Sequence, residues 1–163
     1  MTAVDLRYTA DVEIDAPRER VVAVSVSTAT ENVRQFDPRV QTVQVNEVPD
    51  GEVGQVATIT ALVGKRRVTM TSTTLESHLP DYIVERYTGP GPDHVTRTHF
   101  TELPGGRTRV SIELTIQVPW WNPLLRIALR IATPQGIRDS LGGLKTYLEA
   151  PAPAPGERSD GAS

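Results

Sequence analysis

The sequence of 163 residues contains no cysteine and only eight aromatic residues, which are two Trp, two Phe and four Tyr. Without cysteine, the chain forms no disulfide and binds no metal through thiolates. An excess of basic residues is also missing, because the formal net charge is −3. Nucleic acid therefore has no electrostatic support as a partner.

Long apolar runs are missing as well. No run is long enough to span a bilayer, and the N-terminus, MTAVDLRYTADVEID, is too polar for a secretory signal. We therefore expect a cytoplasmic protein. Its bias towards Ala, Val, Arg, Asp and Pro is typical of a GC-rich bacterial genome.

The length predicts one domain, since domains average roughly 100–200 residues. A chain of this size buries about two-thirds of its unfolded surface and needs no metal to fold. We place the domain at residues 1–150. Residues 151–163 read PAPAPGERSDGAS, a composition that buries little apolar surface and predicts a disordered tail.

The end of the domain has the period of a long helix, which we expect at residues 123–149. Asn122 suits the N-cap, and Pro123 suits the first helical position. Apolar residues then recur at steps of four, three and four, which is one helical face. They are Ile137, Leu141, Leu144 and Leu148. We expect this face to pack inside a sheet.

Two features interrupt this helix pattern. Pro134 should kink or restart the helix, because proline lacks a backbone donor and clashes with the preceding turn. Gly142 and Gly143 weaken it, unless backbone or ligand approaches closely there. Residues 124–132 are apolar nearly all round, apart from Arg126 and Arg130. Such a segment is either buried or covers something apolar.

The rest of the domain reads as strands, turns and two short helices. Alternation of apolar and polar residues, dense threonine and Gly/Pro turns indicate the strands. We expect strands at 5–15, 40–48, 53–63, 66–78, 82–88, 94–103 and 107–118, and helices at 17–25 and 28–36. Thr28 and Glu31 fit a capping box for the second helix. Short turns between strands predict an antiparallel meander in an α+β fold.

Four local motifs in this order resemble one superfamily. They are Val12–Pro17, Phe36-Asp37-Pro38 (with Phe36 where Trp is commoner), Gly106–Val110, and Leu144-Lys145 with Glu149. Across residues 4–150 the chain is similar to the START-like, Bet v 1-like (SRPBCC) superfamily of polyketide cyclase/dehydrase and lipid-transport proteins. The resemblance implies a helix-grip fold, with a curved seven-stranded antiparallel sheet wrapped around the long C-terminal helix. Two short helices lie between its first two strands, and it encloses an apolar cavity.

The resemblance leaves three functions open, because this scaffold carries several. The leading hypothesis is a carrier or sequestering module for a hydrophobic small molecule or lipid. The second is a cofactor-independent cyclase/dehydrase acting on a bound polyketide, and the third is a protein-interaction domain with a filled core. A polar cavity would favour the enzyme, an apolar cavity the carrier, and a filled core the third.

Histidine offers little support for a metal site. His94 and His99 are five residues apart on one expected strand and therefore point to opposite faces. His78 lies beside a turn. The ligand types and spacing that zinc or iron sites need are missing, so we expect no metal and no other cofactor.

The strand 82–88 holds the candidates for acid–base catalysis. Alternation places Tyr82 and Arg86 on one face and Glu85 and Tyr87 on the other. An inward Arg86 would hold a ligand carboxylate or enolate, and an inward Glu85 would take a proton. The ordinary alternative is a solvated face with cross-strand pairs. The sequence leaves open which face looks inward.

A larger set of residues is expected to line a ligand cavity. Thr96, Thr98 and Phe100 share one face of their strand, and with Ile112 and Leu114 they would form an apolar wall with a few hydroxyls. The complete expected set is Met70, Thr96, Thr98, Phe100, Ile112, Leu114, Trp120, Trp121, Leu125 and Leu129. The alternative is a filled core whose threonines bond to backbone.

Trp120 and Trp121 form the one conspicuous motif. Indoles have an apolar body and a polar N–H, so they suit a pocket mouth or a membrane interface. Either ring alone is as well explained by packing of the helix start against the sheet. We expect at least one of the two rings to be partly exposed, with transient membrane-surface contact as one use.

Overall fold

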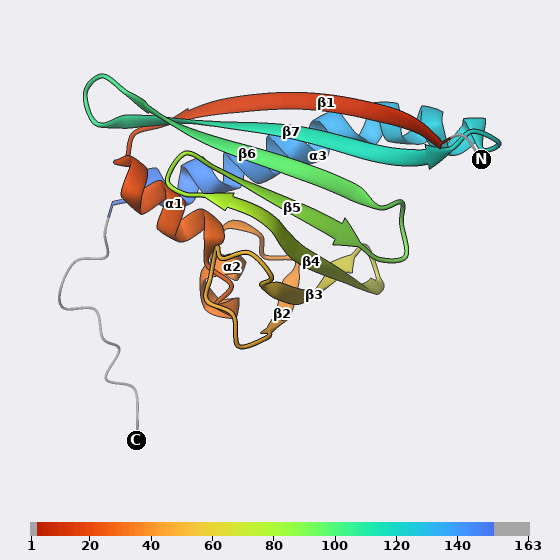
Figure 1. Cartoon of the computed structure of the whole chain (residues 1–163), viewed down its shortest axis with the longest axis horizontal. Coiled ribbons are helices and arrows are strands. Elements are labelled where there is room, and N and C mark those ends of the chain that lie inside the picture. The colour runs from red at the N-terminus through yellow and green to blue at the C-terminus, as the bar shows by residue number, and fades with distance from the viewer. Residues whose placement is uncertain (1–2, 152–163) are drawn as a thin grey trace.

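The computed structural model describes residues 3–151 of the chain, and its elements follow the expected order (Figure 1). They are β1 (Ala3–Ile14), α1 (Arg18–Val26), α2 (Thr30–Phe36), β2 (Val40–Val45), β3 (Val56–Val63), β4 (Arg66–His78), β5 (Tyr82–Thr88), β6 (His94–Leu103), β7 (Arg107–Pro119) and α3 (Pro123–Glu149). The expected tail lies mostly outside the described residues. The α+β helix-grip fold is thus confirmed.

All seven strands form one antiparallel sheet, in the order β1-β7-β6-β5-β4-β3-β2. Connections of two to five residues join neighbours from β3 to β7, as the Gly- and Pro-rich segments predict, and a longer loop, residues 46–55, joins β2 to β3. Gly64, in the turn between β3 and β4, has a positive φ of 63°, which favours glycine. The first strand then pairs with the last over its whole length, from Ala3 opposite Pro119 to Ile14 opposite Thr108.

The helix α3 lies along one face of the sheet, mainly beside β1 and more lightly against β7 (Figure 1). One face of its second half is buried, with exposures of 3% for Leu141, 7% for Leu144 and 1% for Leu148. These leucines share a core with sheet residues and with α1. The other buried members are Ile14, Ala16, Val21, Val22, Ile83, Phe100 and Val110. The expected inward face of the helix is therefore confirmed, with Ile137 at its margin.

Pro134 does not divide the helix, which runs unbroken from Pro123 to Glu149. Leu129 before the proline and Ile137 after it pack against the same apolar cluster of β1 and β7. Because both halves of α3 pack against the same cluster, the helix stays continuous through Pro134. The expectation that the helix restarts there is wrong.

Capping agrees with the sequence at one helix and differs at another. The Asn122 side chain accepts a hydrogen bond from the Leu125 amide at 3.0 Å, as expected of an N-cap. Thr28 does not cap α2, whose N-cap is Ala29 without a side-chain bond. Instead, the Thr28 hydroxyl and amide both donate to the Asp50 carboxylate, which ties the loop before α2 to the β2–β3 loop.

The glycine pair in α3 marks a close approach. A Cβ atom at Gly143 would lie 2.5 Å from the carbonyl oxygen of Phe36, whereas one at Gly142 would meet nothing within 4 Å. Only Gly143 is therefore required by packing, and it lets the end of α2 touch the helix backbone. Among residues 3–151, no helix has the length and hydrophobicity of a membrane-spanning segment.

Candidate functional site

The face of the sheet that α3 covers, called the inner face below, carries the expected wall. Phe100 lies opposite Val110, Thr98 opposite Ile112, and Thr96 opposite Leu114. Directly paired residues in an antiparallel sheet share a face. The register therefore brings together five predicted residues, which are Thr96, Thr98, Phe100, Ile112 and Leu114.

The wall is only partly covered, because α3 sits over β1 and the edge of β7. Phe100 and Leu114 are buried, whereas Thr96, Thr98 and Ile112 stay half-buried. Met70 is also half-buried and shares the inner face through its pairing with Ile59, but it lies on β4, farther from the helix. The middle of the inner face is thus less completely buried than the part that α3 covers.

Glu85 points to the middle of this inner face. It pairs with Thr96, and the next inward residue of its strand, Tyr87, pairs with His94. One carboxylate oxygen of Glu85 accepts from the Ser72 hydroxyl and the other from the Tyr87 hydroxyl, each at 3.2 Å. The three side chains form a polar cluster on an otherwise mostly apolar face, and we call them the Glu85 cluster.

Burial governs the electrostatics of this cluster. Loss of solvent raises the pKa of the Glu85 carboxyl, and the hydrogen bonds from Ser72 and Tyr87 offset this only in part. Burial, with the charge of Glu85, also raises the pKa of Tyr87. The His94 ring stacks on Tyr87 with centroids 5.0 Å apart, and burial lowers the pKa of His94. Among the described residues, no Lys or Arg forms an ion pair with Glu85.

The other two acid–base candidates face away from the cluster. Arg86 points to the outer face, where it forms an ion pair with Asp93 at 3.0 Å. Tyr82 is also on the outer face, between the rings of His78 and His99 and under the guanidinium of Arg97. Neither side chain is placed to touch a ligand on the inner face. The solvated-face interpretation thus applies to Arg86 and Tyr82 but is wrong for Glu85.

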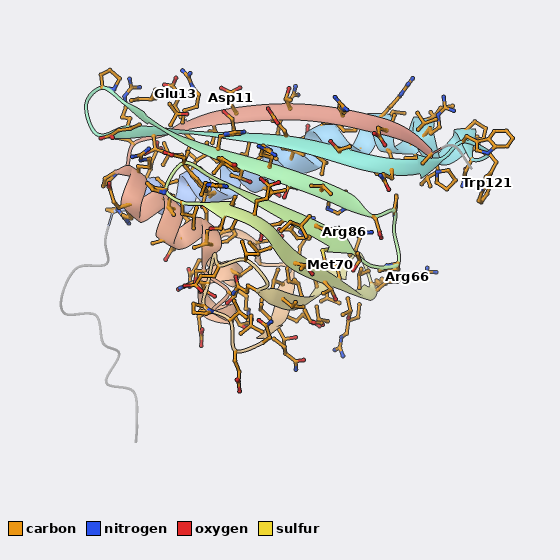
Figure 2. All side chains as sticks on the ribbon, in the orientation of Figure 1. Asp11, Glu13, Arg66, Met70, Arg86 and Trp121 are labelled. Atoms are coloured by element: carbon orange, nitrogen blue, oxygen red, sulfur yellow. The ribbon has the colours of Figure 1, made fainter. Side chains whose placement is uncertain are left out.

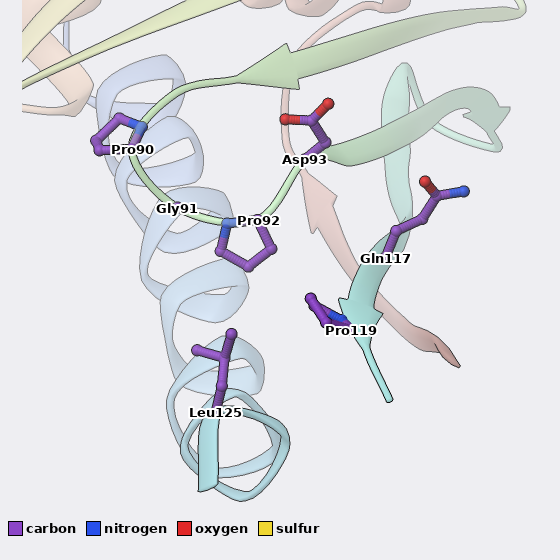
Figure 3. A pocket seen from close by; sticks show the side chains of 7 residues that line it. All are labelled: Pro90, Gly91, Pro92, Asp93, Gln117, Pro119 and Leu125. Atoms are coloured by element: carbon purple, nitrogen blue, oxygen red, sulfur yellow. The ribbon is translucent and has the colours of Figure 1, made fainter. Parts of the chain in front are cut away.

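A pocket of about 490 Å³ opens at the end of the sheet where α3 begins (Figure 3). Leu125 of α3 points towards Pro92 in the loop between β5 and β6. The remaining lining residues are Pro90, Gly91, Asp93, Gln117 and Pro119. Leu129, one turn after Leu125, packs against the cluster formed by Leu6, Leu114, Ile116 and Val118.

Both tryptophans of the expected ligand set lie beside this pocket but do not line it. Trp120 is 59% exposed and Trp121 is 65% exposed. Neither ring packs the helix start against the sheet, so that interpretation is wrong for both. Figure 2 shows Trp121 at the extreme end of the molecule.

Sequence reasoning missed Ser72 of the Glu85 cluster and residues 90–93, which line the pocket. Ser72 is one of many Ser and Thr residues on β4, and alternation alone does not single it out. Residues 89–93, which read GPGPD between two expected strands, have the composition of a loop, and their two prolines supply apolar surface. Cross-strand register was the usable signal, because Thr96 was expected to face inward and Glu85 is its partner.

Comparison with known proteins agrees with this architecture. A sequence model described as polyketide cyclase / dehydrase and lipid transport matches residues 5–149. No curated protein matches the chain significantly.

Among solved structures, the aromatase/cyclase Zhui from Streptomyces sp. R1128 is similar with a TM-score of 0.76 and 16% identity, covering 94% of this chain and 99% of that one. A START superfamily protein from Mycobacterium smegmatis has a TM-score of 0.70 and 13% identity, with coverages of 88% and 97%. The di-domain aromatase/cyclase BexL of the BE-7585A biosynthetic pathway has a TM-score of 0.74 and 25% identity. The match covers 91% of this chain and 51% of BexL, so the chain spans about half of that protein.

Proposed function

Because the chain belongs to the polyketide cyclase / dehydrase and lipid transport family, we propose that it binds a hydrophobic small molecule or lipid between α3 and the inner face of the sheet. The observation that carries this proposal is the half-buried wall of Thr96, Thr98 and Ile112. This wall continues through Leu114, the partner of Thr96, to the cluster against which the pocket residue Leu125 packs. A volume of about 490 Å³ lies in the range of small-molecule sites. Transient contact of Trp120 and Trp121 with a membrane surface and a cytoplasmic location are part of the same proposal.

The chemistry of the wall supports an apolar ligand with a few oxygen atoms. Apolar side chains from β7 and α3 provide most of the surface, and threonine hydroxyls provide isolated hydrogen-bonding points. The incomplete burial of the middle of the inner face counts against an interaction domain with a filled core. Such pockets use few polar groups to orient a ligand that apolar contact holds.

Blocking the pocket tests this proposal. Leu125→Trp should fill the space beside Pro92 and weaken binding of a long-chain fatty acid or a polycyclic aromatic at least about tenfold, or roughly 1.4 kcal/mol. Leu124→Trp is the matched control, because Leu124 lies next in sequence and points to solvent. Isothermal titration calorimetry should give one site per chain. Equal affinity for wild type and Leu125→Trp would contradict the proposed site.

The Glu85 cluster supports a second function, that of a cyclase/dehydrase. The Glu85 carboxylate would take a proton from a carbon beside a ligand ketone, and the resulting enolate would attack a second carbonyl of the same molecule. The new carbon–carbon bond leaves an alkoxide, which takes the proton back, and loss of water can follow. These steps balance without any cofactor or oxidant.

Separating binding from turnover distinguishes the two functions. Glu85→Gln keeps the size of the side chain and removes the base. If the protein is an enzyme, this variant should bind a poly-β-ketone at wild-type affinity and lose cyclisation, as followed by mass spectrometry. If wild type binds the same ligand without turning it over, the carrier function stands alone.

A further inference from the structure

The first half of α3 presents large apolar side chains to solvent. Leu124 is 78% exposed, Ile127 55% and Ile131 75%. Their spacing of three and four residues places them on one helical stripe. Trp120 and Trp121 precede the stripe directly. We call these five residues the α3 stripe.

The stripe is separate from the packing surface of the same helical segment. Leu125 and Leu129 face the sheet and contact the cluster of β1 and β7. The stripe residues belong to neither apolar core of the described chain. A continuous exposed row of this kind is uncommon on a monomer and is typical of an interaction surface.

Positive charge borders the stripe. Residues 120–138 contain Arg126, Arg130 and Arg138 and no acidic residue. Neither Arg126 nor Arg130 forms an ion pair with any described residue. The Nε donor of Arg126 is shielded from water and lacks a hydrogen-bond partner within residues 3–151.

A second basic group lies at the same end of the molecule. Lys65 lies in the turn between β3 and β4, and Arg66 and Arg67 follow at the start of β4. All three are exposed and lie next to the exposed Leu62 and Val63 at the end of β3. Figure 2 places Arg66 and Trp121 at the same end, and Figure 1 shows the β3–β4 turn and the start of α3 there. None of these three basic residues takes part in an ion pair in the described chain.

We propose that the α3 stripe is a docking surface for a bilayer that contains anionic phospholipids, with the β3–β4 turn as a second contact. The indoles would lie at the interface, the aliphatic side chains would enter about 5–10 Å into the headgroup and acyl boundary, and the basic side chains would reach lipid phosphates. This extends the membrane contact proposed for the tryptophans and names its lipid partner. It rests on the proposed function only in making the bilayer the source of the ligand.

Charge favours this partner over a second copy of the chain. A two-fold dimer would place the stripe against itself, because both subunits use the same patch. Arg126 and Arg130 of both copies would then meet without an acidic residue of the stripe between them, which is unfavourable. An anionic bilayer supplies apolar depth and negative charge together.

Docking would also orient the pocket. Leu124 belongs to the stripe, whereas the adjacent Leu125 lines the pocket. A bilayer on the stripe would therefore lie beside the pocket mouth. A lipid-soluble ligand would move between bilayer and pocket over a short path.

Vesicle binding of the full chain tests the proposal. Wild type should sediment with vesicles of phosphatidylcholine mixed with phosphatidylserine, and much less with phosphatidylcholine alone. Its tryptophan emission should shift to shorter wavelength, and brominated acyl chains should quench it. Equal binding to both vesicle types, or binding to neither, would overturn the proposal.

Variants locate the contact. Leu124→Glu combined with Ile131→Glu should abolish sedimentation, and both positions are exposed enough for the fold to tolerate the change. Arg126→Gln and Arg130→Gln should each weaken binding roughly fivefold at low salt. Val53→Glu is the control, since it alters an exposed apolar residue at the opposite end of β3. Wild-type sedimentation of the double variant would overturn the assignment.

Two further measurements separate the alternatives. If light scattering shows a wild-type dimer that the double variant converts to monomer, the occupant is a second copy and the bilayer proposal fails. The long-chain fatty acid used to test the pocket should bind the double variant at wild-type affinity in the absence of vesicles. Loss of vesicle binding with intact ligand binding would support the docking surface, and a failure of ligand binding in both proteins would count against the proposed function alone.

Discussion

The two halves of α3 differ in the burial of their apolar side chains. The second half buries Leu141, Leu144 and Leu148 in the main core, between the sheet and α1. The first half touches the sheet through Leu125 and Leu129 and exposes its other large side chains. One continuous helix therefore has a segment whose apolar residues stabilise the fold and a segment whose apolar residues remain free to bind. Helical period alone does not distinguish them, because both halves carry apolar residues at helical spacing.

The largest expected effect on stability comes from a substitution in the second half of α3. Leu141→Asp places an unpaired charge in the core and should lower the free energy of unfolding by about 3–5 kcal/mol. Circular dichroism melting measures it. Leu124→Asp, in the first half, should change stability by less than about 0.5 kcal/mol. A melting temperature for Leu141→Asp close to that of wild type would mean that this face of the helix is not the core.

A smaller effect tests the contact between α2 and the second half. Gly143→Ala forces a methyl group against the Phe36 carbonyl and should destabilise the protein by about 1–3 kcal/mol. Gly142→Ala meets open space and should stabilise the helix by up to about 1 kcal/mol. Urea unfolding of both variants gives the comparison. Equal effects at the two positions would refute the close approach.

The start of the first half depends on its cap. Asn122→Ala removes the acceptor for the Leu125 amide and should cost about 1 kcal/mol. Asn122→Asp retains an acceptor and is the control. Because the first half has little core contact, amide hydrogen exchange should increase in residues 123–132 and stay unchanged near Leu144. Uniform acceleration along α3 would show that the two halves open together.

The smallest effect depends on pH and lies in the site. Burial raises the pKa of Glu85 above its ordinary value of 4.5. Between the ordinary and the raised value, the folded state holds a proton that the unfolded state has lost, so stability falls as pH rises through this range. Glu85→Gln removes this loss. The melting temperature of Glu85→Gln should therefore rise relative to that of wild type as the pH goes from acidic to neutral.

The exposed Glu113 provides the control for this titration, because Glu113→Gln changes the same chemistry on the outer face. A constant difference between Glu85→Gln and wild type at every pH would contradict the burial of the carboxyl. A difference that moves in favour of wild type as the pH rises from acidic to neutral would do the same.

The sequence predicted most of the fold because its signals are local. Alternation set the strands, and the bounds of β4, β5 and β6 agree with the expected ranges residue for residue. Strand β5 was ambiguous about its faces, because Ile83 and Val84 are both apolar and both buried. The inward position of Glu85 depends on pairing with β6, which is not a local property. Thr28 fits a capping box locally, but Asp50 in a distant loop binds it instead.

The exposure of the first half was the least predictable feature. An apolar helical segment suggests burial, and only the position of α3 over β1 decides which side has a partner. The tryptophan pair was a usable sign that this corner faces outward. Its arginines were the second sign, since the segment 120–138 lacks any acid to neutralise them.

Both tryptophans lie at one exposed corner, so intrinsic tryptophan fluorescence reports on that corner of the protein. Trp120 and Trp121 are already largely in water when the chain is folded. Denaturation should therefore shift their emission little, and fluorescence would record a melt of the core as a nearly silent event. Because unfolding changes this emission little, any marked change in emission reports on the surroundings of the first turn of α3. Its tryptophan probes therefore lie at the edge of the molecule and not in the core.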